Sequence, residues 1–339
     1  MTGLKNVLRI TVFYAAILAV LIFAIGYCEM GAAFPVSNFD GMLIAGGSAF
    51  GMKVDVGGAV IIETPLLESG EKSPAQLAGL RSGDIITGIG SYPINNSAEL
   101  LGAVESGGNE LEIVYLRGGK EKHSIVCPKC GSDGKPKIGV TVRDSAAGIG
   151  TITFIEPNTL TFAGLGHGIC DSERGALLPI AHGSVEQIKI TSINVGKSGA
   201  PGEIRGAFTG KRIGKIIKND ETGVYGVLSE LPKNAGELYP IASAGEISNG
   251  AAHVRSAVSG ESELYEVEIE IIGSGEQKNL FVKVTDERLL ALTGGIVQGM
   301  SGSPLIQNGK LIGAVTHVLV NDPTRGYGIF IENMLEAAR

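Results

Sequence analysis

Short runs in which apolar and polar residues alternate fill much of the chain from residue 138 to the carboxyl end. Clear examples are 151-TITFIE-156, 265-YEVEIEIIG-273 and 311-LIGAVTHVLV-320. A period of two places every second side chain on one face of a β-strand, and glycines bound most of these runs. The pattern therefore predicts one large all-β domain over residues 138–339, either a barrel or a sandwich.

Two helices are predicted within this β domain. The segment 285-TDERLLALTG-294 has the apolar spacing of a helix, and Thr285 or Asp286 is expected to cap its amino end. The tail 331-IENMLEAAR-339 has a similar pattern.

A stretch of 19 uncharged residues, 10–28, stands near the amino end. A helix of this length can cross the ~30 Å hydrocarbon core of a bilayer. Lys5 and Arg9 precede the stretch and Glu29 follows it, so the amino terminus is expected on the cytoplasmic side and the rest of the chain on the exported side. The alternative is a signal peptide cleaved at residues 31–33, although the apolar run exceeds a usual signal core of roughly 7–15 residues.

Changes in composition divide the chain further. The stretch 131-GSDGKPK-137 is rich in glycine, lysine and proline, which is typical of a linker. We expect a cytoplasmic stub and transmembrane anchor over residues 1–30, a linker over 31–45, a small domain over 46–127, a second linker over 128–137 and the β domain over 138–339.

The small domain resembles a PDZ domain in the stretch 73-SPAQLAGLRSGDIITGIG-90, which follows the pattern SPA-x-x-AGL-x-x-GD-x-I-x-x-I. An amphipathic helix is predicted over 97–104, with Ser97 as its cap, before a final strand. PDZ domains bind an extended peptide by adding it as a strand. By position alone, the loop for the peptide carboxylate is expected at Phe50, Gly51 and Met52. A purely structural module is the alternative.

Composition agrees with a fold of many short strands. Glycine accounts for 51 of 339 residues, tryptophan is absent and aromatic residues make up 5%. Hydrophobic residues make up 44%, enough for substantial cores, and the length suggests two or three domains. The net charge is −7 and no basic run is present, so nucleic-acid binding is not expected.

The cysteines form no obvious framework. Cys127 and Cys130 make a single CPKC, and His123 supplies at most a third ligand for a zinc site that needs about four. A local disulfide or two free thiols is the prediction for this pair. No metal or cofactor is expected.

The stretch 298-QGMSGSP-304 offers a serine nucleophile, Ser301. A serine needs a base to take its proton, and the developing oxyanion needs backbone N–H donors, for which Gly299 and Ser301 are placed. Ser303 stands where a G-x-S-x-G elbow requires glycine. The stretch instead resembles the G-x-SG-x-P of chymotrypsin-like serine peptidases, in which a hairpin and then a cleft-lining strand follow. Asn308-Gly309 is a strong two-residue hairpin turn.

The base is expected to be one of five histidines: His123, His167, His182, His253 and His317. His167 lies between glycines in 161-TFAGLGHGICD-171, on a glycine-rich turn after the predicted strand 151-TITFIEP-157, and is the preferred candidate. By the peptidase resemblance, Thr316 and His317 lie on the strand that lines the substrate cleft, although packing alone would also explain them.

The combination of GLGHGICD, VTDERLL and GGIVQGMSGSPLIQNGKLIGAVTHVLVNDPTRGYGIFIENML with a PDZ-like domain resembles the stage IV sporulation protein B family of serine peptidases. The resemblance covers nearly the whole chain. It implies a chymotrypsin-like double β-barrel with His167 as general base, Asp286 as orienting acid and Ser301 as nucleophile. Asp286 is nearer to the serine than in ordinary chymotrypsin-like enzymes. Asp171, which is close to His167 in sequence, and Asp220, in a turn expected to be exposed, are the other candidate acids.

The family resemblance also implies a setting. Its members act between the forespore and the mother cell of endospore-forming bacteria. They cleave a membrane-bound regulator of an intramembrane protease, which leads to activation of a late sigma factor, and they cleave themselves near the anchor. Their PDZ domain holds a peptide of a partner or of the same chain.

Two other functions remain open from the residues alone. One is a non-catalytic peptide-binding scaffold that keeps the peptidase fold. The other is a hydrolase with Cys170 as nucleophile, although Cys170 and His167 stand close together on one turn.

Overall fold

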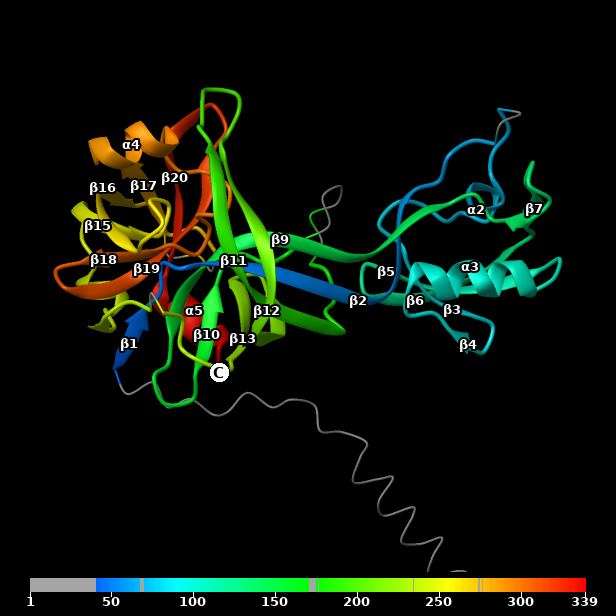
Figure 1. Cartoon of the computed structure of the whole chain (residues 1–339), viewed down its shortest axis with the longest axis horizontal. Coiled ribbons are helices and arrows are strands. Elements are labelled where there is room, and N and C mark those ends of the chain that lie inside the picture. Colours follow the sequence, from blue (N-terminus) through cyan, green and yellow to red (C-terminus); the bar gives the residue numbers. More distant parts are fainter. Residues whose placement is uncertain are drawn as a thin grey trace, which may run out of the picture. The chain divides into compact units, whose positions relative to one another are not determined.

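The computed structural model describes residues 41–67, 70–170, 175, 177–233, 235–273, 275 and 277–339. Strands predominate, as the alternation of apolar and polar residues predicts (Figure 1). The apolar stretch 10–28 lies outside the described residues. No helix within the described residues is long and apolar enough to cross a membrane.

Six strands of the amino-terminal half of the β region pair in a ring. The order of pairing is β9-β10-β13-β12-β11-β2, and β2 pairs again with β9. The phenyl rings of Phe50 and Phe162 meet edge to face in its core. The strands are β2 (Ala49–Glu63), β9 (Thr141–Ile155), β10 (Thr161–Gly164), β11 (His182–Asn194), β12 (Glu203–Asp220) and β13 (Gly223–Leu228). Two short strands, β1 (Met42–Ala45) and β14 (Leu238–Pro240), extend this sheet beside β9.

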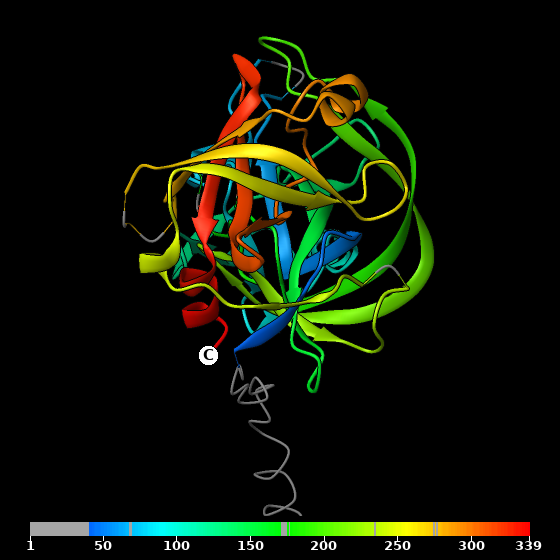
Figure 2. The ribbon, with the colours of Figure 1, turned by 90° about the vertical axis from the view of Figure 1, so that its left-hand side faces the viewer.

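The carboxyl-terminal half forms a second, closed barrel with the order β15-β16-β17-β20-β19-β18. Its strands are the yellow-to-red ribbons of Figure 2. They are β15 (Gly250–Ser256), β16 (Glu263–Ile271), β17 (Leu280–Val284), β18 (Pro304–Gln307), β19 (Lys310–Leu319) and β20 (Asp322–Phe330). Two helices, α4 (Glu287–Thr293) and α5 (Ile331–Ala337), and a 3₁₀ turn, η1 (Ala244–Glu246), accompany it. Both predicted helices are confirmed.

The Asn308-Gly309 turn joins β18 to β19. Asn308 has φ 51° and Gly309 has φ 72°, which are the two left-handed residues of a tight hairpin turn. The chain thereby reverses directly after Ser301 and places β19 beside the serine.

The PDZ-like part has its own apolar core, with members from Ala59 to Val142. Its elements are α2 (Pro74–Leu77), β3 (Ile85–Ile89), β4 (Tyr92–Pro93), α3 (Ser97–Ser106), β5 (Leu111–Arg117), β6 (Lys120–Val126), β7 (Lys129–Cys130) and β8 (Pro136–Lys137). Ser73 and Gln76 form a capping box at α2. The cap of α3 is Asn96, not Ser97 as predicted. Ser97 instead bonds the Asp144 carboxylate through its N–H (2.5 Å) and its hydroxyl (2.8 Å).

Strands β2 and β9 belong to both the barrel and the PDZ-like part, and they run side by side in Figure 1. Residues 49–55 of β2 pair with 145–151 of β9 in the barrel, and residues 60–63 pair with 141–143 beyond it. The barrel therefore includes residues 49–55, which the expected limits of 46–127 place in the small domain. One alternating apolar run serves two cores, so composition alone shows no boundary.

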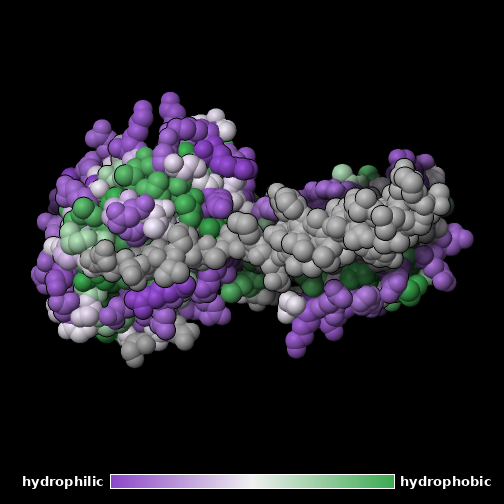
Figure 3. Space-filling model, turned by 90° about the horizontal axis from the view of Figure 1, so that it is seen from below, coloured by the Kyte–Doolittle hydropathy of each residue, from purple (hydrophilic) through white to green (hydrophobic). Residues whose placement is uncertain are grey.

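Some apolar side chains remain exposed at the sheet edge. Met42 of β1 and Leu238 of β14 are 42% and 52% exposed. On the face drawn in Figure 3, hydrophobic residues gather in a patch on the barrel region and hydrophilic residues border it.

Candidate active site

Ser301 lies in a tight turn between α4 and β18. Gly299 has φ 97° and Gly302 has φ 94°, a backbone conformation that residues with a side chain rarely adopt. A Cβ on Gly302 would lie 2.1 Å from the carbonyl oxygen of Thr151 and 2.4 Å from the nitrogen of Leu165. Glycine is therefore required for the serine turn to approach β9 and the segment that leads to His167.

Strand β9 holds this turn through three hydrogen bonds of two threonines, and a fourth joins β9 to the histidine segment at Leu165. The Thr151 hydroxyl donates to the Gly299 carbonyl and the Thr153 hydroxyl to the Gly302 carbonyl, each at 2.8 Å. The Thr151 N–H donates to the Ser301 carbonyl at 2.9 Å, and its carbonyl accepts from the Leu165 N–H at 3.2 Å. The position of the serine is thus fixed from β9, far away in the sequence.

The backbone around Ser301 agrees with the predicted oxyanion site. The Met300 N–H donates to Val297 and the Gly302 N–H to Val315. Within the described part of the chain, the N–H groups of Gly299 and Ser301 donate to no other residue. Two unpaired donors two residues apart are the arrangement that a carbonyl oxygen with developing negative charge requires.

The Ser301 hydroxyl donates to the Thr316 carbonyl at 2.7 Å. The Thr316 side chain is buried and its hydroxyl has no hydrogen-bond partner among the described residues. The expected position of Thr316 beside the serine is therefore found, but it is the backbone carbonyl that makes the contact.

His167 follows two residues with left-handed backbone, Leu165 (φ 69°) and Gly166 (φ 68°). Such a conformation is uncommon for leucine and persists only where its surroundings impose it. A Cβ on Gly166 would lie 2.9 Å from Cγ2 of Thr316, so this segment passes directly over β19. The structure thereby brings the histidine turn close to the serine turn, and no hydrogen bond joins the two side chains among the described residues.

The imidazole of His167 has two neighbours. Its Nδ1 lies 2.9 Å from the Gly168 carbonyl oxygen, and its ring centroid lies 4.7 Å from that of His317. A carbonyl can only accept, so Nδ1 carries the proton and Nε2 keeps its lone pair. Burial lowers the pKa of His167, and the Gly168 hydrogen bond opposes this in part. The ring is therefore neutral near pH 7, as a general base must be.

His317 is exposed on β19 and touches His167 with one side of its ring. Lost hydration and then the neighbouring charges of His167 and Lys278 lower its pKa. Its predicted place beside the site is thus observed. Its contact with the other histidine was not foreseen, because residues that distant in sequence carry no signal of pairing.

Asp286 has a different position from the one predicted. It caps α4, where its carboxylate accepts from the N–H groups of Arg288 and Leu289, and Arg288 Nη2 lies 2.8 Å from Oδ2. The hydrogen bond from Arg288 is the main cause that lowers its pKa to about 2. No hydrogen bond joins Asp286 to His167 among the described residues. The role of orienting acid is corrected to that of a helix cap.

The predicted position of the loop for a peptide carboxylate is also wrong. Phe50, Gly51 and Met52 lie inside β2, which is paired with β9 on one side and with β11 on the other. Phe50 is fully buried in the barrel core. Their backbone has no free edge for a peptide.

Asn219 supports the histidine turn and was missed by the sequence reasoning. Its Oδ1 accepts from the Ile169 N–H at 2.8 Å, and its Nδ2 donates to the carbonyls of Ile169 and Leu178. Cys170 is exposed and its sulfur lies 3.7 Å from the Gly168 carbonyl that also contacts His167. Asp171 lies outside the described residues.

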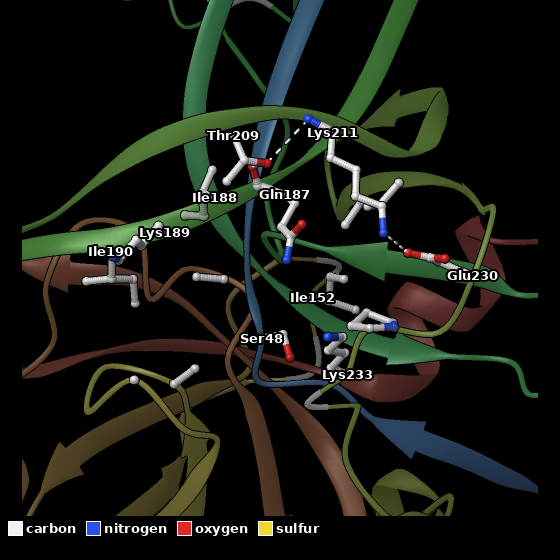
Figure 4. Close-up of a pocket in the computed structure, with 15 residues that line it drawn as sticks. Ser48, Ile152, Gln187, Ile188, Lys189, Ile190, Thr209, Lys211, Glu230 and Lys233 are labelled. Carbon is white, nitrogen blue, oxygen red and sulfur yellow. Dashed lines mark hydrogen bonds and ion pairs between the residues drawn. The ribbon is translucent and has the colours of Figure 1, made fainter.

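A separate cavity of about 620 Å³ lies between β11, β12 and the loops near Lys233 and Gly260 (Figure 4). Its isoleucines are bordered by Lys211, which pairs with Glu230. None of its lining residues is a histidine or a cysteine. This cavity is distinct from the serine–histidine site. Within the described residues, no group of three or more metal-ligating side chains is found.

A segment of 57 residues is 44% identical to the mitochondrial serine protease HTRA2 of Drosophila persimilis and 42% identical to that of Drosophila virilis. It covers 17% of this chain and only 13% and 14% of these relatives, so the chain spans a small part of their length.

Among solved structures, the PDZ domain of an SdrC-like protein from Listeria monocytogenes is 25% identical, with a TM-score of 0.22, and covers 25% of this chain and 87% of its own. The active form of the Rv3671c protease of M. tuberculosis is 14% identical, with a TM-score of 0.34, and covers 56% of this chain and 72% of its own. TM-scores this low support no inference.

The decisive match is to a family. Residues 134–335, more than half of the chain, match the family described as SpoIVB peptidase S55. The matched range includes His167, Ser301 and the strands that hold them. The chain therefore belongs to the SpoIVB peptidase S55 family.

Proposed function

We propose that the chain is a serine endopeptidase in which Ser301 is the nucleophile and His167 the general base. The observation that supports this best is the contact between the two turns. Gly302 packs against Leu165, and Gly166 packs against Thr316, whose carbonyl accepts the Ser301 hydrogen bond. Family membership gives the same pair of residues a peptidase context.

The reaction begins with rotation of the Ser301 hydroxyl away from the Thr316 carbonyl. Nε2 of the neutral His167 then takes the proton while Oγ attacks the substrate carbonyl. The N–H groups of Gly299 and Ser301 stabilise the oxyanion. His167 returns the proton to the leaving amine, and water releases the acyl group by the same steps.

No carboxylate orients His167 in this proposal. The Gly168 carbonyl fixes the tautomer that a triad acid would otherwise fix. It cannot stabilise the imidazolium as well as a carboxylate would, so we expect slower turnover than in enzymes with a complete triad.

For the PDZ-like part, the free edge of β9 is a better place for a peptide than the predicted loop at residues 50–52. In the described residues, β9 pairs over 141–143 with β2 alone, and α3 is held beside it by the bonds from Ser97 to Asp144. We propose that a peptide ligand adds as a strand along this edge of β9.

The biological setting is also a proposal. The chain would be anchored by residues 10–28, with its domains on the exported side between forespore and mother cell. There it would cleave a membrane-bound regulatory protein, and itself, as a signal during sporulation that leads to a late sigma factor. The family name and the uncharged stretch support this proposal.

The test is labelling with a fluorophosphonate probe together with mass spectrometry of self-cleavage fragments. The wild type is expected to be labelled at Ser301 and to yield fragments. Ser301→Ala and His167→Ala should each lose roughly 10³-fold or more of the activity. The matched control is His253→Ala, which removes an exposed histidine of β15. Fragments that persist in folded Ser301→Ala protein, or labelling at Cys170, would refute the mechanism; a wild type that is inert but binds peptides would favour the scaffold alternative.

A further inference from the structure

A pocket of about 360 Å³ adjoins the serine turn. Gln298 and Gly299 form one wall, and Ile149, Ile204 and Phe208 contribute apolar side chains. A volume of this size falls in the lower range of protein ligand pockets and is sufficient for a single bulky side chain.

The pocket is fixed relative to the proposed oxyanion donors. The Gln298 N–H donates to Gly202, and the Gln298 carbonyl accepts from Ile204, each at 2.8 Å. A Cβ on Gly299 would lie 3.1 Å from Cβ of Ile204. The backbone that would receive the substrate carbonyl therefore rests directly on the pocket wall.

The apolar side chains of the pocket are held by close packing. Ile204 is 3% exposed and belongs to the core of the second barrel. A Cβ on Gly51 would lie 2.4 Å from Cε1 of Phe208, so the phenyl ring packs directly on the backbone of β2. Lys53 covers this ring from outside, with Nζ 5.0 Å from its centroid. Such a surface favours burial of a hydrocarbon side chain.

The one charged residue that lines the pocket is Glu203. Its carboxylate is half exposed and lies 3.6 Å from Nε of Arg205, which does not line the pocket. A second carboxylate here would be repelled by Glu203 and would lose hydration against isoleucine and phenylalanine.

We propose that this pocket binds a bulky apolar side chain of the substrate, such as Leu, Met or Phe, next to the scissile bond, and that Glu203 disfavours acidic side chains there. The inference rests on the proposed peptidase function. It makes Phe208, Ile204 and Glu203 determinants of specificity.

The test uses the full chain and decapeptide mixtures in which one position at a time is fixed as Leu, Ala or Glu. Ala147 is exposed at the rim, so Ala147→Phe would fill the pocket. The matched control is Ala207→Phe, because Ala207 is exposed on β12 but points away from the pocket, opposite to Phe208. The readouts are the ratio of kcat/KM for Leu over Ala at each position and the cleavage of Glu peptides.

The wild type is expected to favour Leu at one position beside the cut. Ala147→Phe should lower this preference roughly 10-fold, and Ala207→Phe should leave it unchanged. Glu203→Gln should improve cleavage of Glu peptides at that position without altering the Leu preference. Equal preferences in the wild type and Ala147→Phe would overturn the inference while leaving the peptidase proposal intact.

A binding measurement tests the pocket proposal separately from the peptidase proposal. In the Ser301→Ala background, calorimetry should show tighter binding of the Leu than of the Ala mixture, and Ala147→Phe should abolish this difference. If the wild type cuts nothing but this difference is found, the peptidase proposal fails and the pocket stands. If the Leu and Ala mixtures bind equally, the pocket assignment is wrong.

Discussion

The imidazole rings of His167 and His317 lie with their centroids 4.7 Å apart and their planes tilted by 35°. Within the described residues, no carboxylate makes a hydrogen bond or an ion pair with either ring. The site therefore places two titratable rings side by side, and the charge of His167 disfavours the charged form of His317. This relationship, together with the position of Asp286, determines how the protein should respond to pH and to substitution.

Acid should destabilise the protein below about pH 6.5. The pKa values of His167 and His317 are lowered in the folded state, mainly because both rings lose hydration, while the unfolded chain keeps ordinary values near 6.5. The unfolded state then binds more protons between the folded and unfolded pKa values, so stability falls as the pH drops through this window. Melting temperatures measured from about pH 8 to pH 5 should decline, and His317→Gln should weaken the decline.

The lowered pKa of His167, which makes the fold less stable in acid, should allow activity to persist to lower pH. His167 has to be neutral to act as base, so the acid limb of kcat/KM should lie below pH 6.5. In His317→Gln, water reaches the ring and the limb should move upward. The exposed His253→Gln serves as control for both measurements. An acid limb above pH 6.5 in the wild type, or identical limbs in both proteins, would contradict this reading of the site.

Asp286 should matter for stability more than for chemistry. Asp286→Ala removes the cap of α4 and is expected to cost about 1 kcal/mol of unfolding free energy, whereas Asp286→Asn keeps a capping side chain. Because Asp286 is not bonded to His167, kcat of Asp286→Asn should fall by less than about 10-fold; a triad acid lost in this way costs about 10⁴. Thermal unfolding and kcat, measured on both variants, decide whether Asp286 is a helix cap or a triad acid. A loss near 10⁴ with an unchanged melting temperature would restore the triad assignment.

Thr151→Val should weaken both the fold and the site. The substitution leaves the Gly299 carbonyl without its buried donor, which costs about 1–3 kcal/mol. The turn that presents the Gly299 N–H then loses its support, so kcat should fall more than KM changes. Thr209→Val removes an exposed hydroxyl that donates to Gln187 and is the control. Unchanged kcat in folded Thr151→Val would show that β9 does not position the turn.

Gly302→Ala should prevent the native serine turn. The added Cβ would lie 2.1 Å from the Thr151 carbonyl oxygen in a backbone with φ 94°. Gly309→Ala is the matched control, since it also has positive φ, 72°, but nothing within 4 Å of the added atom. It should cost only the left-handed conformation, about 1 kcal/mol. Equal melting temperatures and probe labelling for the two variants would argue against the tight approach of Gly302 to β9.

Much of the architecture could be predicted because its causes are local. Alternation at 265-YEVEIEIIG-273 gave β16, the Asn308-Gly309 pair gave the hairpin, and Asp286 gave the cap of α4. Composition could not show that β2 is a single strand that enters two cores. The carboxylate loop at residues 50–52 failed for the same reason, since strand pairing on both sides is a property of neighbours that are distant in sequence.

The chain by itself determined the strands, the turns and the two chemical groups, Ser301 and His167, each framed by glycines that allow close approach. Only the tertiary structure decided what each group touches. Asp286 bonds to Arg288 because the first turn of a helix offers its N–H groups to whatever carboxylate precedes it. His167 meets His317 and Ser301 meets the Thr316 carbonyl because β19 passes beneath the histidine turn. Those contacts depend on how two barrels' strands pack around one turn, and no local pattern encodes them.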